Sequence, residues 1–156
     1  MLSPREFTVG TFADAKPLSL ILPRTQHEET VLFGHLNNVT MAVFLSGQNP
    51  FLSFESADNK SWMGLIVPDV SIEVDETSAF NPAAIDTPLG SVLRMDTRLA
   101  IEARTESSFR SKAITLHNDL MPAGEFSAGF KTWQVVIGEG HSKRVLWRTP
   151  DPKPAG

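Results

Sequence analysis

The chain of 156 residues contains no cysteine. This excludes disulfide bonds, thiolate metal ligands and a thiol nucleophile, although it does not identify a cellular compartment. The first residues, MLSPREFTVGTF, lack the basic segment and apolar run of a secretory signal peptide. No apolar run approaches the roughly 18 residues that a membrane-spanning helix needs. We therefore expect a soluble, cytoplasmic protein with no membrane partner.

Familiar catalytic motifs are also missing. The sequence has no nucleophile elbow, no Walker loop and no dinucleotide fingerprint. Its four histidines, His27, His35, His117 and His141, lie too far apart for the paired spacings of zinc or cupin-like centres. We expect no metal and no cofactor, and the sequence favours a non-enzymatic protein without excluding an enzyme.

Helical periodicity is absent too, because no segment of about 11 residues or more repeats its apolar positions every 3.6 residues. Short apolar or alternating runs separated by turn residues take its place. They predict an all-β protein, an antiparallel sandwich, jelly roll or barrel of about nine short strands with little helix. We expect a single domain over residues 1–149, followed by a flexible proline-rich tail at 150–156.

The clearest local signal is a hairpin around Asn37-Asn38, since asparagine tolerates the positive φ of a type I′ turn. Both of its strands, 31–36 and 39–45, are apolar on both faces, so something must cover each face. Asn81 and Pro82 are expected to start a single capped helical turn. Further strands are expected at 51–56 and 62–67, which would form a second hairpin, and at 92–104, 109–117, 126–137 and 144–147.

The stretch VSIEVDET at 70–77 places three carboxylates, Glu73, Asp75 and Glu76, within four residues. Its alternation is typical of a half-buried strand with one wet face. Glu73 and Asp75 would lie about 7 Å apart along such a strand, a separation that an inverting hydrolase could use. Nothing nearby in the sequence would raise the pKa of either carboxyl. Cross-strand ion pairs with Arg94 and Arg98, which alternation places on one face of 92–104, are the simpler interpretation.

Charge is divided unevenly along a chain whose net charge is −4. Residues 1–90 hold 4 basic and 11 acidic residues, whereas residues 91–156 hold 10 basic and 7 acidic ones. The acidic balance makes a nucleic-acid partner unlikely on electrostatic grounds. Either the two halves pair within one fold, or an acidic and a basic face meet between subunits.

A small-ligand site is the other feature that the residues suggest. His35 lies in a strand that is apolar on both faces, and His117 ends an amphipathic strand beside Asn118. Arginines are good phosphate donors, and a tryptophan beside basic residues can stack a base or sugar. The alternative is a core histidine and a core tryptophan with ordinary surface arginines. The candidate ligand-binding residues are His35, Arg94, Arg98, His117 and Trp133.

Two short motifs resemble those of PilZ domains. Asn59–Gly64 fits the pattern [D/N]-x-S-x-x-G, and Arg94–Arg98 fits R-x-x-x-R. The resemblance implies cyclic dinucleotide binding through these residues. In that family the arginine motif comes first, and here the order is reversed, so no family is assigned from it.

Three functional hypotheses follow. The first is a non-enzymatic all-β binding or assembly module that acts through protein–protein contacts, as a homo-oligomer. The second is a barrel or sandwich that binds a small anion, a nucleotide or a sugar. The third is a hydrolase that uses Glu73 and Asp75. The sequence does not specify strand order, oligomer number, ligand or pathway.

Overall fold

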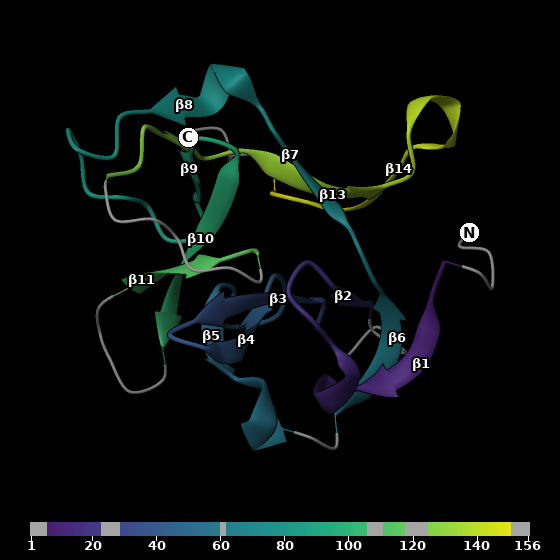
Figure 1. Cartoon of the computed structure of the whole chain (residues 1–156). Coiled ribbons are helices and arrows are strands. Elements are labelled where there is room, and N and C mark those ends of the chain that lie inside the picture. Colours follow the sequence, from purple (N-terminus) through teal and green to yellow (C-terminus); the bar gives the residue numbers. More distant parts are fainter. Residues whose placement is uncertain (1–5, 23–28, 60–61, 106–110, 118–124, 151–156) are drawn as a thin grey trace.

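The computed structural model describes residues 6–22, 29–59, 62–105, 111–117 and 125–150, and in these the protein is all-β (Figure 1). None of the helices in this part of the chain has the length and apolar character needed to cross a membrane. Of the predicted flexible tail, 150–156, residues 151–156 lie outside the described ranges. The strands are β1 (Thr8–Thr11), β2 (Leu20–Leu22), β3 (Val31–Leu36), β4 (Val39–Phe44), β5 (Leu52–Glu55), β6 (Met63–Val67), β7 (Ser71–Val74), β8 (Ala79–Phe80), β9 (Val92–Met95), β10 (Arg98–Thr105), β11 (Ser111–Thr115), β12 (Ala128–Phe130), β13 (Trp133–Ile137) and β14 (Arg144–Arg148).

Most strands belong to one large sheet in the order β1-β6-β2-β3-β4-β5-β10-β9-β12-β8. Strand β11 pairs with both β10 and β3, so β3, β4, β5, β10 and β11 close into a barrel. A second sheet has the order β14-β13-β7 and lies above the β2–β5 region in Figure 1. The prediction of an all-β barrel or sandwich is confirmed.

The hairpin at Asn37-Asn38 is confirmed. Leu36 lies opposite Val39, and the two asparagines between them have φ angles of 50° and 67°. These positive values are those that a two-residue type I′ turn requires.

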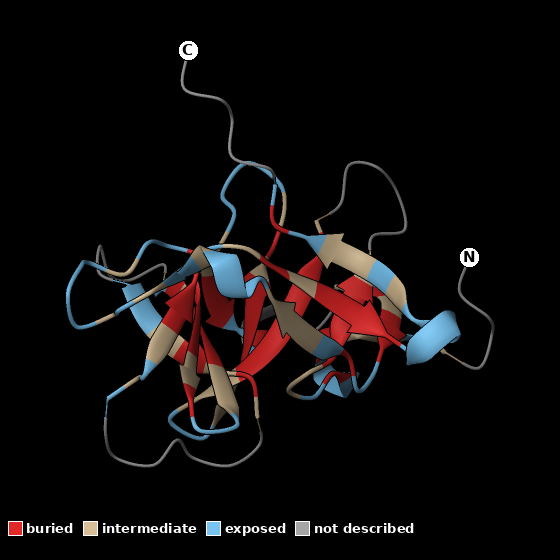
Figure 2. Cartoon of the chain, turned by 90° about the horizontal axis from the view of Figure 1, so that it is seen from above, coloured by how far each residue is buried: buried red, intermediate tan, exposed pale blue. Residues whose placement is uncertain are grey.

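The chain covers both apolar faces of β3 and β4 itself. On one face, Leu32 and Val43 join a core that also holds Ile101 and Trp133, between the barrel wall and the second sheet. On the other face, a second core contains Phe12 from the short helix η1 (Phe12–Asp14). Buried residues follow the central strands, and exposed residues lie in the surrounding turns (Figure 2).

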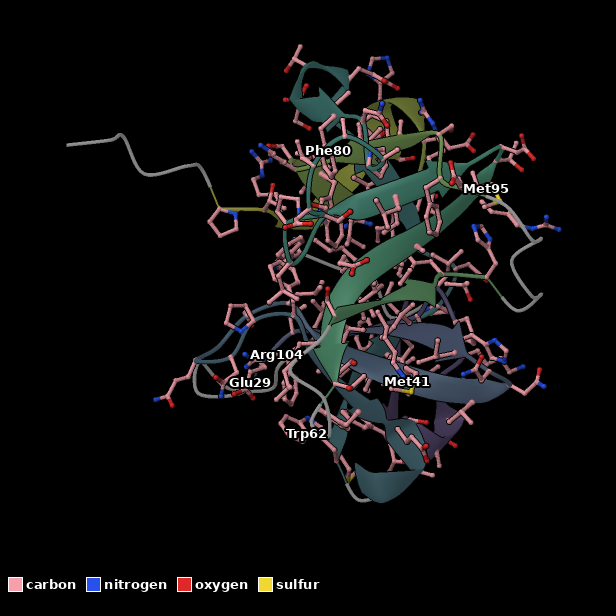
Figure 3. All side chains as sticks on the ribbon, turned by 90° about the vertical axis from the view of Figure 1, so that its left-hand side faces the viewer. Glu29, Met41, Trp62, Phe80, Met95 and Arg104 are labelled. Atoms are coloured by element: carbon pink, nitrogen blue, oxygen red, sulfur yellow. The ribbon has the colours of Figure 1, made fainter. Side chains whose placement is uncertain are left out.

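Aromatic rings fill the second core. The Phe12 ring centroid lies 5.1 Å from that of Phe33 in an edge-on contact and 5.4 Å from that of Trp62 in a stacked one. Figure 3 shows Trp62 and Met41 in the lower half of the molecule and Phe80 and Met95 in the upper half. The predicted need for a cover on each side of the hairpin is thus met within one chain.

The second predicted hairpin, 51–56 with 62–67, is wrong. β5 pairs with β4 and, in parallel, with β10, whereas β6 pairs with β1 and β2. The helix η2 (Ser56–Asn59) begins the connection between them. Alternation identifies a strand but not its neighbour, and here each strand pairs with segments distant in sequence.

The predicted single strand over 92–104 is also wrong. It is a hairpin of β9 and β10, in which Met95 lies opposite Arg98 and Asp96 has a φ of 54°. Aspartate tolerates this left-handed conformation, which allows a two-residue turn. The turn shifts the alternation by one position, so Arg94 shares a face with Leu99 and not with Arg98.

The predicted strand 126–137 is divided as well. Its first part, β12, belongs to the large sheet, and its second part, β13, belongs to the second sheet. The capped turn at Asn81 is present: the Ala83 amide donates to Asn81 Oδ1 and the Ala84 amide to the Asn81 carbonyl, both at 3.0 Å.

Candidate functional site

Two of the five predicted ligand residues lie on the outer face of the barrel, and a third lies close to them. Thr115 of β11 lies opposite both His35 of β3 and Ala100 of β10, so these positions share a face. Arg98 is two residues from Ala100 in β10, which places it on that face too, whereas His117 lies in the bend that follows β11. The structure therefore brings His35 and Arg98 to one face of the barrel, with His117 beside the start of β10.

His117 already has a structural partner there. The backbone amide of Leu99 donates to His117 Nε2 at 3.1 Å. This contact ties the end of β11 to the start of β10, which makes His117 part of the barrel closure.

We predict that replacing His117 by alanine lowers the free energy of unfolding by about 1–3 kcal/mol, because the Leu99 amide is partly buried and loses its acceptor. Urea unfolding measures the loss. His141 in the exposed turn η4 (Gly140–Ser142) provides the matched control, and its alanine variant should stay within about 0.5 kcal/mol of the parent. Equal effects of the two substitutions would contradict the structural role of His117.

The other two predicted residues lie elsewhere. Trp133 is 1% exposed, and its indole N–H donates to the Gly90 carbonyl at 2.8 Å. Arg94 lies 4.7 Å above the Phe130 ring and bonds Glu76 at 3.2 Å. The five residues therefore do not form one site, and the expectation that Arg94 and Arg98 act from one face is corrected by the β9–β10 turn.

Ion pairing links the two differently charged parts of the sequence. Glu73 pairs with Lys143 at 3.1 Å, Glu76 pairs with Arg94, and Glu6 pairs with Arg144. Each of these contacts joins an acidic residue from 1–90 to a basic residue from 91–156. This favours pairing within one fold over an acidic and a basic face that meet between subunits.

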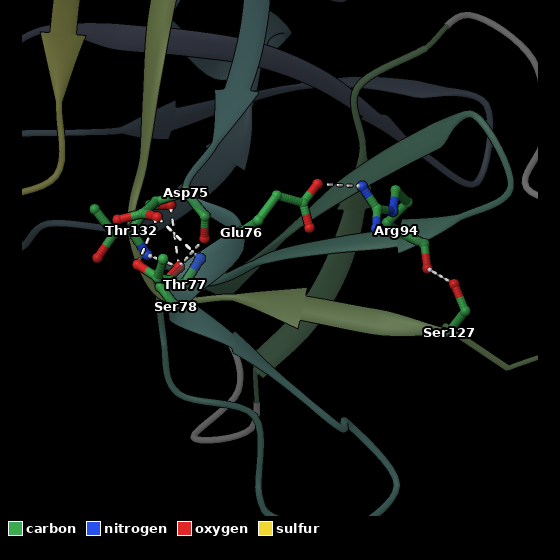
Figure 4. A network of polar contacts seen from close by, with 7 residues as sticks. All are labelled: Asp75, Glu76, Thr77, Ser78, Arg94, Ser127 and Thr132. Carbon is green, nitrogen blue, oxygen red and sulfur yellow. Dashed lines mark hydrogen bonds and ion pairs between the residues drawn. The ribbon is translucent and has the colours of Figure 1, made fainter.

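The acidic stretch is one strand followed by a cap. β7 ends at Val74, and Asp75 is the N-cap of the helix η3 (Glu76–Ser78), where its Oδ1 accepts from the Thr77 amide at 3.0 Å and the Thr77 hydroxyl at 2.7 Å. Figure 4 shows this cap, its contact with Thr132, and Glu76 reaching Arg94. The predicted carboxylate–arginine pair exists, but with Glu76 as the acid.

Both carboxyl groups of the hypothetical hydrolase are held in their ionised form. The Gln134 side-chain amide, at 2.9 Å, and then Lys143 lower the pKa of Glu73. The Thr77 hydroxyl and amide lower the pKa of Asp75. A general acid needs a raised pKa, so this pair offers nucleophile or base chemistry at most.

A pocket of about 270 Å³ lies over the same polar face of the second sheet. Gln134 of β13 lies opposite Glu73 on one side and Arg148 on the other, so their side chains point the same way. Among the described residues, no group of three histidines or carboxylates is placed to hold a metal ion. The pocket is thus lined by an acidic residue, Glu73 of β7, on one side and by a basic residue, Arg148 of β14, on the other.

An apolar surface lies at the β1 end of the large sheet, and the sequence did not predict it. Val9 of β1 is 65% exposed and Met63 of β6 is 41% exposed. Leu65 lies opposite both Val9 and Leu22, so all four side chains share one face. We call Val9, Leu22, Met63 and Leu65 the apolar strip. The lack of charged residues in its strands could have indicated this surface, but β1 is too short to be recognised as a strand from the sequence.

The fold and its surfaces define a protein with an all-β barrel and an additional sheet. Residues 9–156 match the family model described as "Uncharacterised protein y4lG". The chain is 57% identical over 152 residues to the uncharacterized protein y4lG of Sinorhizobium fredii (strain NBRC 101917 / NGR234). The matched region covers 97% of this chain and 94% of that relative. The chain belongs to the y4lG family. No solved structure matches it.

Proposed function

We propose that the protein is a non-enzymatic all-β assembly module that forms homo-oligomers through the apolar strip. The observation that carries this proposal is the exposure of Val9 and Met63, which are diagonal neighbours on one face of the β1–β6 pair and flank Leu65. Exposed apolar side chains scattered singly are common, but contiguous ones mark contact surfaces.

The strip continues the first core outward. Further along the same face, Val67 and Leu20 are buried in that core, and Phe7 packs against it. Burial then decreases from this end of the face toward Val9 and Met63. Among the described residues nothing covers this end of the core, which is the pattern of a surface that a partner completes.

A second copy is the partner that the charges favour. The segments 7–13, 18–22 and 62–67 contain no Asp, Glu, Lys or Arg, although the whole chain has a net charge of −4. Two acidic molecules can therefore meet at this surface without bringing like charges together, and like-charge contacts are costly at an interface.

The alternatives have less support. A small ligand could enter the pocket between Glu73 and Arg148, but the predicted ligand residues are divided between two faces and a core. A hydrolase would need a carboxyl of raised pKa, and both candidates are lowered.

We predict that the parent protein forms a defined oligomer in light scattering coupled to size exclusion, and that replacing Val9 by lysine dissociates it. A charge buried at an interface is costly, so the dissociation constant should rise about tenfold or more, which corresponds to roughly 1.4 kcal/mol. Val145→Lys is the matched control, because Val145 is also a valine on an outer strand, β14, and is 38% exposed.

The control variant should keep the parent's mass. A parent protein that is monomeric at high concentration would overturn the proposal, and so would equal loss of assembly in both variants, since that would place the contact outside the apolar strip.

A further inference from the structure

We infer that the outer edge of β1 pairs with β1 of a second copy, antiparallel about a two-fold axis, so that the large sheet continues from one subunit into the next. This inference rests on the proposed homo-oligomeric function and specifies its contact. It follows from the hydrogen-bonding direction of β1, from the lack of charge on that strand, and from a comparison with the other sheet edges.

The direction of each backbone group in β1 follows from its pairing with β6. The Phe12 amide donates to the Trp62 carbonyl at 3.1 Å, directly beyond the pair Thr11 and Met63. Hydrogen-bonded and non-hydrogen-bonded pairs alternate along an antiparallel ladder. Gly10 therefore bonds Gly64, and the N–H and C=O of Val9 and Thr11 point away from β6.

One of these outward groups already has a partner within the chain. The Thr11 amide donates to Asp14 Oδ2 at 2.9 Å, which closes that end of the edge. The outward groups of Val9 are the ones left for another strand, because β1 pairs only with β6 among the strands of the described ranges. The open part of the edge is thus centred on Val9.

With a two-fold axis at Val9, the outward groups of the two copies can bond each other, so no other segment is needed. The two Val9 residues would face each other as a hydrogen-bonded pair, each amide donating to the other carbonyl. Residues directly opposite in a ladder point to the same face. The two exposed Val9 side chains and the two Met63 side chains would then form one continuous apolar surface.

Other sheet edges in the described part of the chain carry the usual protection. β14 has Arg144 and Arg148, and β7 has Glu73 and is followed by Asp75. β8 has two residues. Charges and short length prevent unwanted pairing at edges. β1 carries no charged side chain and no proline from Phe7 to Ala13, and the Asp14 carboxylate protects only its Thr11 end, so the part around Val9 stays open. Its edge is therefore suited to pairing.

Disulfide trapping tests this contact directly, because the parent chain has no cysteine. Cα atoms of a hydrogen-bonded antiparallel pair lie about 5.5 Å apart, within the range that a disulfide spans. Val9→Cys should give a covalent dimer under mild oxidation at a yield several times that of Val145→Cys, the matched exposed valine on β14. Equal yields would overturn the pairing.

Proline separates backbone pairing from apolar contact. Val9→Pro removes only the outward N–H, keeps an apolar side chain and should leave the β1–β6 ladder intact. We expect it to weaken the dimer at least tenfold while far-UV circular dichroism stays unchanged. If Val9→Lys dissociates the oligomer but Val9→Pro does not and Val9→Cys is not trapped, strand pairing is wrong and the proposed function stands. If the parent is a monomer, both are wrong.

Discussion

Replacing Trp133 by alanine should lower the free energy of unfolding by about 3–5 kcal/mol, the usual cost of removing a large aromatic side chain from a core. The ring is 1% exposed and lies 4.8 Å from that of Trp147. It belongs to the core that also holds Leu32 of the barrel, so it joins the second sheet to the barrel. For a chain of this length, the melting temperature should fall by roughly 6–20 °C.

The hydrogen bond of Trp133 can be measured apart from its volume. Trp133→Phe keeps an aromatic ring but leaves the Gly90 carbonyl without its donor, and we expect it to cost about 1–3 kcal/mol. It also serves if the alanine variant does not fold. Trp147, which is only partly buried, is the matched control, and its phenylalanine variant should cost less. Calorimetry that ranked the two phenylalanine variants in the opposite order would contradict the role of Trp133 as the junction.

Local turn chemistry explains which parts of the fold could be predicted. Asn37-Asn38 encodes its own turn, so the β3–β4 hairpin was evident from a few residues. The pairing of β5 with β10 is encoded by no neighbouring residue, because strand partners are chosen by packing across the whole chain. β1 was not predicted either, because it has four residues, one of them Gly10, and forms only by pairing with the distant β6.

The candidate site shows a second limit, that of alternation itself. Alternating residues continue through Asp96 and Thr97 as they would through a strand, yet Asp96 turns the chain and sends Arg94 and Arg98 to opposite faces. The PilZ-like arginine pair therefore does not present two guanidinium groups from one face. The charge division was informative, but no sequence pattern specified Lys143 as the partner of Glu73, since the two residues meet only through the fold.

Phe12→Ala tests the other core, with an expected loss of about 3–5 kcal/mol. Phe12 is fully buried, and its ring contacts those of Phe33, Phe54 and Trp62 at centroid distances of 5.1, 5.9 and 5.4 Å. Thermal unfolding would measure the loss. Phe12→Leu retains most of the volume and should cost less than about 1.5 kcal/mol.

The result for Phe12 bears on how the protein assembles. The sequence showed that β3 and β4 are apolar on both faces, which an oligomer could explain as well as an intramolecular cover. If η1 provides the cover, the loss caused by Phe12→Ala is the same at every protein concentration, and the dissociation constant set by Val9 and Met63 does not change. A loss below about 1 kcal/mol, or one that vanished at high concentration, would mean that another copy covers this face. The assembly contact would then lie on the barrel wall and not at the edge of β1.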